Sequence, residues 1–237
     1  MCNVEKIIET NRAFEENINY TFKDKNLLLL ALTHSSYTNE NKKWKFPSNE
    51  RIEFLGDSVL CIVISEYLYL NRPDMAEGKM SKVRSGIVRE ISLADVARKI
   101  KLDEYILLGK GEEVTGGRHR DSILEDSFES LVGAIYLDSD LETIRKFILT
   151  SMEDIIKKII NGKIILDFKS RLQERVQHDG VLGISYNIIK EEGPDHDKKF
   201  KVNVEIDGKV MGEGIGRSKK EAEQNAAKQA LERINNA

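Results

Sequence analysis

Two segments of the chain place carboxylates on the polar side of patterns that are otherwise apolar. These carboxylates are Glu50, Glu53 and Asp57 in the first segment and Asp126 and Glu129 in the second. At about 100° per residue, those of the first segment fall within about 60° of one another on a helix. Carboxylate oxygens without His or Cys neighbours are the ligands that Mg²⁺ and Mn²⁺ prefer. We therefore expect a hard divalent cation between two acidic helices.

A cation held in this way would lower the pKa of a bound water and stabilise the charge of an in-line phosphoryl displacement. The alternative is a solvated acidic surface, which is the more common explanation of such spacing in a chain with 32% charged residues. Two features favour the cation site. The acidic stripes contain no Lys or Arg four residues after an acid, and Gly56, which weakens a helix interior, indicates close packing beside Asp57.

The elements that carry these acids belong to a first part of the chain with helical periodicity throughout. Apolar residues recur there at intervals of three or four, for example at Ile52, Leu55 and Val59. This pattern ends near Asn161-Gly162. We therefore expect an all-α domain that positions the acidic segments.

Beyond this point the periodicity becomes that of a small α+β module. Residues 200–206 alternate between apolar and polar, which predicts a half-buried strand, and Asp207-Gly208 after them predicts a tight hairpin. Ser218, with Glu221 three residues later, predicts a capping box at the start of a final helix. The expected order is a helix, three antiparallel strands and a helix.

Two lysines follow that cap directly. Lys219 and Lys220 would occupy the first turn of the final helix, where cations oppose the helix dipole by about 0.3–1 kcal/mol each. Free backbone N–H groups and neighbouring cations together make an anion site. A phosphate is the ligand we expect there, and a tolerated surface pair is the alternative.

Composition excludes several classes of protein. The chain has 237 residues and a formal net charge of −3, so it is not a polybasic nucleic-acid coat. Its longest apolar run, 59–64, is far too short to span a bilayer, and its beginning lacks the apolar core of a signal peptide. Cys2 and Cys61 lie far apart, which is typical of a reduced chain. We expect a cytoplasmic protein without a membrane partner.

The motifs together resemble the ribonuclease III family. Asn49–Leu60 resembles the signature of that family, Leu30–Tyr37 its upstream helix and Ser122–Ala134 its second acidic helix. The resemblance runs nearly from end to end. It implies an all-α ribonuclease III catalytic domain over 1–161, followed by an α-β-β-β-α double-stranded RNA-binding domain over 164–235.

The resemblance also implies roles for individual acids. Those that match the four metal-binding carboxylates of the family are Glu53, Asp57, Asp126 and Glu129. Asp57 and Glu129 match the two that are most critical for hydrolysis. Glu50 and Glu77 match acidic positions that assist at the same site. The implied cofactor is Mg²⁺, with Mn²⁺ as a substitute, and no small-molecule cofactor is expected.

The implied activity is endonucleolytic hydrolysis of double-stranded RNA by a homodimer. Its products would carry a 5′-phosphate, a 3′-hydroxyl and a short 3′ overhang, and its substrates would include precursors of ribosomal RNA and structured messenger RNAs. Phe54 matches an aromatic that the family packs into the partner subunit. An ordinary core phenylalanine is the alternative for this residue.

The C-terminal module resembles a domain that grips A-form RNA by shape. Gln173 and Glu174 match the helix face that enters one minor groove, and Pro194 and His196 match the loop that enters another. Lys219 and Lys220 match the clamp on the phosphates between the grooves. The loop departs from the family in having an additional acid, Asp197, which would weaken its contact.

Two rival functions stay open from sequence. A non-enzymatic RNA-binding or ribosome-associated protein could keep the fold, but such a protein is expected to lack one or more of the central carboxylates. A nucleotide hydrolase could use the same acidic cluster, but it leaves the C-terminal module unexplained. Incubation with long duplex RNA, with and without Mg²⁺, distinguishes the three.

Overall fold

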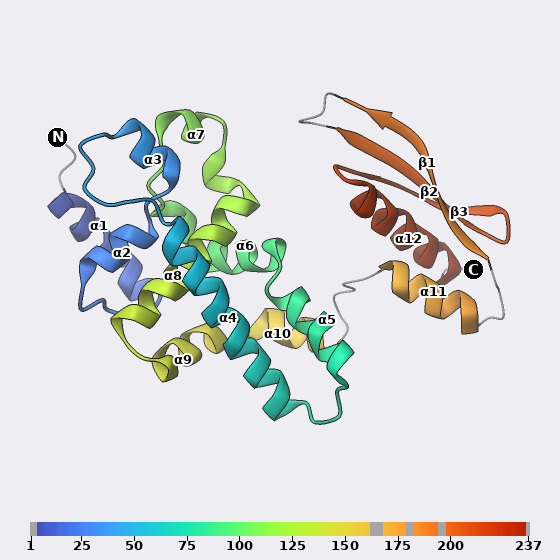
Figure 1. The fold of residues 1–237 in the computed structure, drawn as a ribbon, viewed down its shortest axis with the longest axis horizontal. Coiled ribbons are helices and arrows are strands. Elements are labelled where there is room, and N and C mark those ends of the chain that lie inside the picture. Colours follow the sequence, from blue (N-terminus) through green and yellow to red (C-terminus); the bar gives the residue numbers. More distant parts are fainter. Residues whose placement is uncertain (1–3, 162–167, 179–182, 194–197, 236–237) are drawn as a thin grey trace. The chain divides into compact units, whose positions relative to one another are not determined.

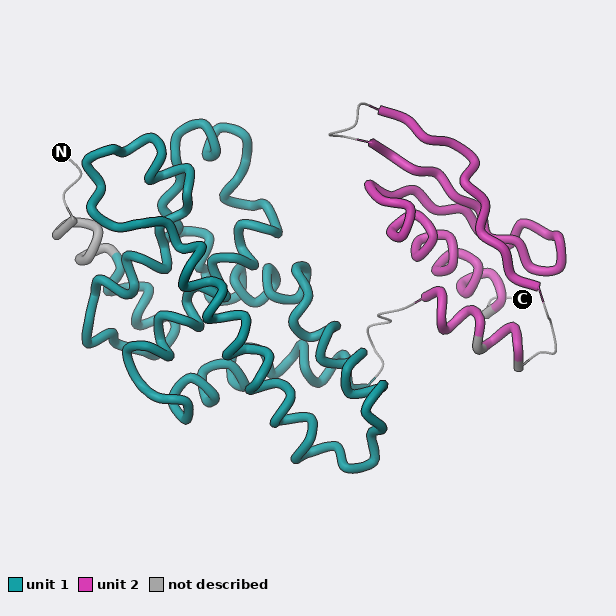
Figure 2. Tube along the Cα trace, in the orientation of Figure 1, with its two compact units in different colours: residues 1–164 teal, residues 165–237 magenta. Residues whose placement is uncertain are grey.

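The computed structural model describes residues 4–161, 168–178, 183–193 and 198–235. Contacts between residues divide the chain into two compact units, residues 1–164 and 165–237 (Figure 2). Within the described ranges, no helix is both long enough and apolar enough to cross a membrane.

The first unit is helical, as predicted (Figure 1). Its α-helices are α1 (Val4–Asn17), α2 (Lys25–Ala31), α3 (Ser35–Glu40), α4 (Glu50–Asn71), α5 (Glu77–Ile87), α6 (Glu90–Lys99), α7 (Lys110–Val114), α8 (Asp121–Asp138), α9 (Leu141–Ser151) and α10 (Glu153–Ile160). Two short 3-10 helices, η1 (Leu102–Glu104) and η2 (Gly117–His119), lie between them. The predicted acidic segments are the start of α4 and the first half of α8.

Helix α8 lies at the centre of this unit and packs along α4. Phe128, Leu131 and Ile135 of α8 are completely buried, and so are Leu60 and Ile64 of α4. Burial of each such side chain contributes about 1.5–3 kcal/mol relative to exposure. Ile52 and Val59 of the predicted apolar face of α4 are buried as well, whereas Ile62, at the same spacing, is exposed, so the prediction is wrong at that position.

The end of α8 is tied to the segment that precedes α2. The carboxylate of Asp138, only 9% exposed, accepts a hydrogen bond from the Tyr20 hydroxyl at 2.6 Å. It also accepts from the backbone N–H groups of Lys23 at 2.9 Å and Asp24 at 2.8 Å. These bonds satisfy a buried charge with three donors, which is the condition under which such a charge stabilises a fold.

The second unit has the predicted α-β-β-β-α order. Its elements are α11 (Phe168–His178), β1 (Ile184–Glu192), β2 (Lys199–Ile206), β3 (Lys209–Gly216) and α12 (Lys219–Asn235). The strands form an antiparallel sheet in the order β1-β2-β3. The hairpin prediction is confirmed, because Asp207 and Gly208 join β2 to β3 with φ of 49° and 74°. Positive φ at both positions is the pattern of a type I′ turn.

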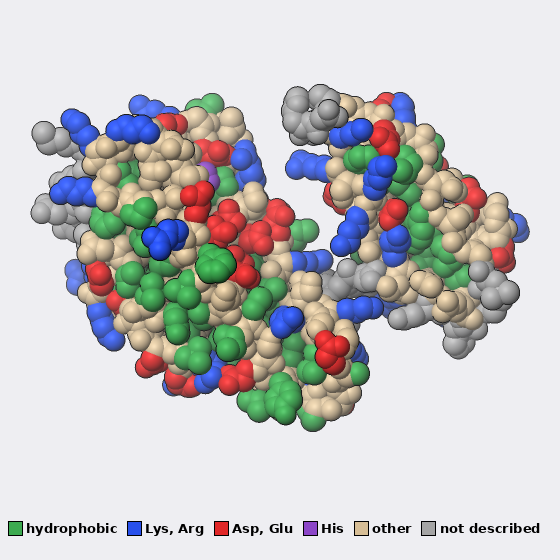
Figure 3. Space-filling view, viewed as in Figure 1, with side chains coloured by type: hydrophobic (Ala, Val, Ile, Leu, Met, Phe, Trp, Pro, Cys, Tyr) green, Lys and Arg blue, Asp and Glu red, His purple; other side chains and the backbone are tan. Residues whose placement is uncertain are grey.

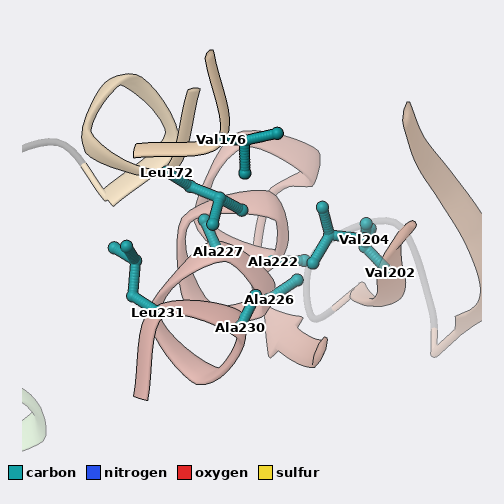
Figure 4. Packing of buried hydrophobic residues seen from close by; sticks show 9 residues of the cluster. All are labelled: Leu172, Val176, Val202, Val204, Ala222, Ala226, Ala227, Ala230 and Leu231. Atoms are coloured by element: carbon teal, nitrogen blue, oxygen red, sulfur yellow. The ribbon is translucent and has the colours of Figure 1, made fainter. Parts of the chain in front are cut away.

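The two helices of this unit cover one face of the sheet. Figure 4 shows the core, in which small side chains of α12 meet apolar side chains of α11 and β2. Its members are Leu172, Val176, Val202, Val204, Ala222, Ala226, Ala227, Ala230 and Leu231. A Cβ on Gly214 of β3 would lie 2.2 Å from the backbone oxygen of Ala222, so α12 rests directly on that strand.

The start of α12 has the cap that the sequence predicts, with one difference. The Ser218 hydroxyl accepts from the Glu221 N–H at 3.1 Å. The Glu221 carboxylate reaches back to the N–H of Arg217 at 2.7 Å, one residue before the cap, whereas a capping box would return to Ser218 itself. In either geometry, side-chain oxygens accept hydrogen bonds from backbone N–H groups at the start of α12.

Candidate active site

The acidic residues of α4 and α8 meet because the two helices touch backbone to backbone. A Cβ on Gly133 of α8 would lie 2.4 Å from the backbone oxygen of Ile52 in α4, and Gly56 makes the reciprocal contact with α8. Glu53 and Asp57 flank this crossing on α4, and Glu129 lies at it on α8. Figure 3 shows the result, a group of acidic side chains over α4 and α8 on one face of the helical unit.

Glu129 is the most buried of these acids, with 8% of its surface exposed. Burial, followed by the nearby negative charges, raises the pKa of its carboxyl to about 8. The charges that act on it are those of Asp57, Glu125, Glu53 and Asp126. Since charges from both helices act on one carboxyl, the structure brings the predicted α4 and α8 acids into a single electrostatic site.

The same coupling is seen from the other side of the site. The pKa of Glu53 is raised by burial and then by repulsion from Asp126, Glu50 and Asp57. The pKa of Asp126 is raised by burial, which outweighs the opposite effect of His34. Glu53 and Asp126 are half-buried, whereas Glu50 and Asp57 are exposed. Among the predicted metal ligands, exposure to solvent thus decreases from Asp57, through Glu53 and Asp126, to the buried Glu129.

Sequence reasoning missed a further acid of this site, Glu125. Burial, followed by repulsion from Glu90 at the start of α6 and from Asp126, raises the pKa of Glu125 to about 7. Glu125 precedes Glu129 by four residues, so the helical spacing used for the other acids already placed it on the same face. No helical spacing connected Glu90 with these acids, because it belongs to another helix, α6.

Two other residues near the site were also not anticipated. His34 is the N-cap of α3 and exerts its effect on Asp126 although 92 positions separate them in the chain. The thiol of Cys61 donates to Oδ1 of Asp57 at 3.5 Å, and burial, followed by the charge of Asp57, raises the pKa of that thiol. Cys61 therefore lies beside the acidic cluster instead of in the apolar core.

Glu77 is placed differently from the other predicted acids. It begins α5, is exposed, and accepts from the Ser81 hydroxyl at 2.9 Å. Together with residues of α4 it lines a separate cavity of about 310 Å³. The charges that dominate the pKa shifts of Glu53 and Glu129 do not include Glu77. Its assisting role stays a prediction.

The core alternative for Phe54 is wrong. Its side chain is 77% exposed, and it shares a face of α4 with two other exposed apolar residues, Ile62 at 57% and Tyr69 at 72%. These three residues, here called the α4 apolar face, fall within about 80° of one another on the helix. This face borders the acidic one, and hydrophobic side chains adjoin the acidic group in Figure 3.

The predicted RNA-binding residues are only partly described. Gln173 is an exposed residue of α11, and Lys219 and Lys220 are the exposed first residues of α12. Glu174 lies on α11, but its side chain is outside the described part, as are Pro194 and His196 entirely. The lysine pair therefore does follow the Ser218 cap, with both side chains accessible to a phosphate.

The donor set fits a hard cation in its chemistry, although the ligands are not gathered around a point. Within the described ranges, no three His, Cys, Asp or Glu side chains are arranged to hold an ion as they stand. The like charges of these carboxylates raise the energy of one another's ionised forms, and a bound cation would offset this repulsion. Oxygen donors from two helices, with burial at Glu129, match the preference of Mg²⁺ for carboxylates and retained waters.

Comparison with known proteins gives the same division of the chain. Residues 24–156 match the family model described as Ribonuclease-III-like, and residues 168–234 match the double-stranded RNA binding motif. Ribonuclease 3 of Caldanaerobacter subterraneus is 55% identical over 220 residues, which are 93% of this chain and 96% of that protein. Ribonuclease 3 of Clostridium beijerinckii is 53% identical over 223 residues, 94% of this chain and 95% of the relative.

A solved structure agrees with the helical unit. The nuclease domain of ribonuclease III from Campylobacter jejuni superposes with a TM-score of 0.57 at 41% identity, covering 61% of this chain and 96% of that one. An acidic helical domain followed by an α-β-β-β-α RNA-binding module defines an endoribonuclease of double-stranded RNA. The chain belongs to the ribonuclease III family.

Proposed function

We propose that this chain hydrolyses double-stranded RNA with Mg²⁺ held by the carboxylates of Glu53, Asp57, Asp126 and Glu129. The observation that carries the proposal is the electrostatic coupling of Glu129 to acids of both helices at a nearly buried position. A structural role alone does not explain this arrangement, because repelling acids destabilise the metal-free fold. A divalent cation converts the repulsion into attraction.

The protein's own residues then have distinct tasks. When bound, Mg²⁺ or Mn²⁺ supplies a water of lowered pKa and a positive charge against the phosphate oxygens. Glu129 must release its proton for this, because a carboxylate binds a cation only when it is ionised. Asp57 is exposed and so is accessible to a substrate phosphate from solvent. Glu50 adds negative charge at Glu53, and Glu125 adds it at Glu129. Glu77 is proposed to assist from α5.

The second unit is proposed to hold the duplex by its shape. Gln173 presents a hydrogen-bonding side chain from α11, and Lys219 and Lys220 present cations at the start of α12. An A-form duplex offers 2′-hydroxyls in its minor groove and phosphates across the major groove, which match these two kinds of group. Contacts by Glu174, Pro194 and His196 stay predictions of the resemblance.

We further propose that the active form is a homodimer built on the α4 apolar face. Exposed aromatic and aliphatic residues that share one helix face mark an interface more often than isolated exposed residues do. The Campylobacter jejuni domain is described as having a region involved in dimer formation. A dimer would also supply two cutting centres for the two strands of a duplex.

The remaining details follow from family membership alone. These are the 5′-phosphate and 3′-hydroxyl ends, the short 3′ overhang, the processing of ribosomal RNA precursors and structured messenger RNAs, and the cytoplasmic location. No contact among the described residues bears on these details. They stay predictions.

Incubation of the pure protein with a long RNA duplex tests the function. With Mg²⁺ we expect short duplexes whose ends are ligatable 5′-phosphates, and with EDTA we expect intact RNA. The same RNA as a single strand without secondary structure serves as the control substrate and should persist. Intact duplex under both conditions would favour the non-enzymatic RNA-binding protein, and turnover of mononucleotides alone would favour the nucleotide hydrolase.

A further inference from the structure

An acidic residue already forms an ion pair with the lysine that is proposed to bind phosphate. Glu191, near the end of β1, directs Oε2 to Nζ of Lys198 at 3.1 Å and Oε1 to Nζ of Lys219 at 3.4 Å. Lys198 directly precedes β2, and Lys219 begins α12. One carboxylate therefore links three segments of the RNA-binding module at the predicted phosphate site.

The same two lysines also make cation–π contacts with an aromatic ring. The Nζ atoms of Lys198 and Lys219 lie 5.8 Å and 5.7 Å from the centroid of the Phe200 ring. The ring itself is anchored, because Phe200 packs against the core of the module. Cation–π contacts at such distances orient an ammonium without neutralising it. The hydrogen bond from Lys198, followed by that from Lys219, also lowers the pKa of Glu191.

We propose that Glu191 is an intramolecular competitor of the RNA backbone for Lys219 and so lowers the affinity of the module for duplex RNA. This rests on the proposed RNA contact of Lys219. A phosphate that approaches this ammonium also approaches the Glu191 carboxylate, and the two anions repel. The ion pair must weaken before the phosphate contact forms. An exposed ion pair of this kind changes an equilibrium by about two- to fivefold.

The opposite role, in which Glu191 helps RNA by orienting Lys219, has less support from the geometry. Phe200 already contacts the Lys219 ammonium through its ring, and this contact does not involve the carboxylate. Removing Glu191 would then relieve repulsion while leaving the lysine in place. The two roles predict opposite signs, which makes the choice between them measurable.

The test compares Glu191→Gln with the unaltered full chain. Binding to a labelled duplex is measured in EDTA, so that cleavage does not interfere. We expect Glu191→Gln to lower Kd about two- to fivefold. The matched control is Glu192→Gln, which removes the same charge one residue away, where the carboxylate pairs with Lys190 instead. This control reports general electrostatics, and we expect a change of less than about twofold.

Two further readouts show whether the effect passes through Lys219. The slope of log K against log salt concentration should steepen by up to about 0.9 in Glu191→Gln, because Lys219 then neutralises a phosphate without first losing an internal partner. In a Lys219→Gln background the gain from Glu191→Gln should fall to half or less, with Lys198 carrying the remainder.

Unchanged or weaker binding by Glu191→Gln would overturn the competitor role, and so would an equal gain in Glu192→Gln. An undiminished gain in the Lys219→Gln background would overturn the route through Lys219. Failure of the unaltered chain to bind duplex RNA would be a different result. It would remove the RNA-binding proposal itself, and this inference together with it.

Discussion

A Cβ atom on Gly56 would lie 1.7 Å from the backbone carbonyl oxygen of Glu129. Helices α4 and α8 therefore approach each other too closely to leave room for a side chain at Gly56, one residue before Asp57 and at the most buried acid of the cluster. The contact that builds the core of the helical unit is also the contact that sets the spacing of the carboxylates. Stability and site geometry depend on the same glycine.

Replacement of Gly56 by alanine should separate the two helices. Because the new methyl group meets a backbone oxygen instead of a flexible side chain, we expect a loss of about 1–3 kcal/mol or more in the free energy of unfolding. Cleavage of duplex RNA should fall with it, because the carboxylates of α4 and α8 move apart. Chemical denaturation and the cleavage assay measure the two effects.

Gly78→Ala is the matched control for this change. A Cβ on Gly78, in the first turn of α5, would meet nothing within 4 Å. We expect its unfolding free energy to stay the same or to rise by up to about 1 kcal/mol, because alanine is favoured over glycine in a helix. Equal losses in both variants, or no loss in Gly56→Ala, would contradict the close packing of α4 and α8.

Phe54→Glu should convert the proposed homodimer into monomers. The substitution places a charge on the α4 apolar face, where desolvation in an interface would be unfavourable. Sedimentation or light scattering measures the molar mass. Val114→Glu is the control, because Val114 is 87% exposed on α7 and lies outside the α4 apolar face. A dimer that persists in Phe54→Glu would contradict an interface on the α4 apolar face. Dissociation in Val114→Glu would place the interface elsewhere.

Asp138→Asn should destabilise the helical unit in a pH-dependent way. Burial alone would raise the pKa of Asp138, but the hydrogen bonds from Tyr20, Asp24 and Lys23 outweigh it and hold the pKa below its usual range. Because the folded pKa is depressed, the stabilisation is present above the unfolded value of about 3.9 and is lost as the pH falls through the folded value. We expect the variant to lose about 2–4 kcal/mol at pH 7.

The difference between the unaltered protein and Asp138→Asn should shrink when unfolding is measured below about pH 4. Asp95→Asn is the control, because the Asp95 side chain is 58% exposed and forms an ion pair with Arg98 at 3.5 Å on the surface. Its effect should stay within about 0.5 kcal/mol at every pH. A difference at Asp138 that is independent of pH would contradict the ionised hydrogen-bonded carboxylate.

Without metal, the contribution of Glu129 to stability should depend on pH in the direction opposite to that of Asp138. In EDTA, Glu129 keeps a proton up to about pH 8, whereas the unfolded chain releases it near pH 4.3. The folded state therefore binds more protons in this window, and stability falls as the pH rises through it. Mg²⁺ should raise the melting temperature at pH 8 by binding the ionised carboxylates. Equal Mg²⁺ shifts in Glu129→Gln and the unaltered protein would contradict this.

Local signals in the sequence predicted much of the architecture. The Asp207-Gly208 turn, the Ser218 cap and most of the apolar stripes of α4 and α8 depend on residues near one another in the chain and are present in the structure. Ile62 is the exception, because it continues the spacing of the α4 stripe but is exposed. The acidic stripes could be predicted for the same reason. Glu125 obeys the same four-residue spacing with Glu129, so the sequence also contains a local signal for this acid.

Contacts between distant segments could not be predicted in this way. The influence of His34 on Asp126 and the contact of Glu191 with Lys219 depend on how separate elements pack. The presence of a glycine inside a helix indicated close packing at Gly56, but it did not identify Gly133 as the partner glycine. Nor did it distinguish a buried Phe54 from an exposed one, because its wheel position lies at the border between two faces.

The most direct test of the central claim is duplex cleavage by Glu129→Gln in Mg²⁺, with RNA binding measured in parallel in EDTA. The amide keeps the size of the side chain but removes the ionised oxygen, so we expect the cleavage rate to fall by about a thousandfold or more while Kd for RNA changes less than about twofold. Glu104→Gln, at an exposed acid of η1, should cleave normally. Undiminished cleavage by Glu129→Gln would contradict the metal-dependent site between α4 and α8.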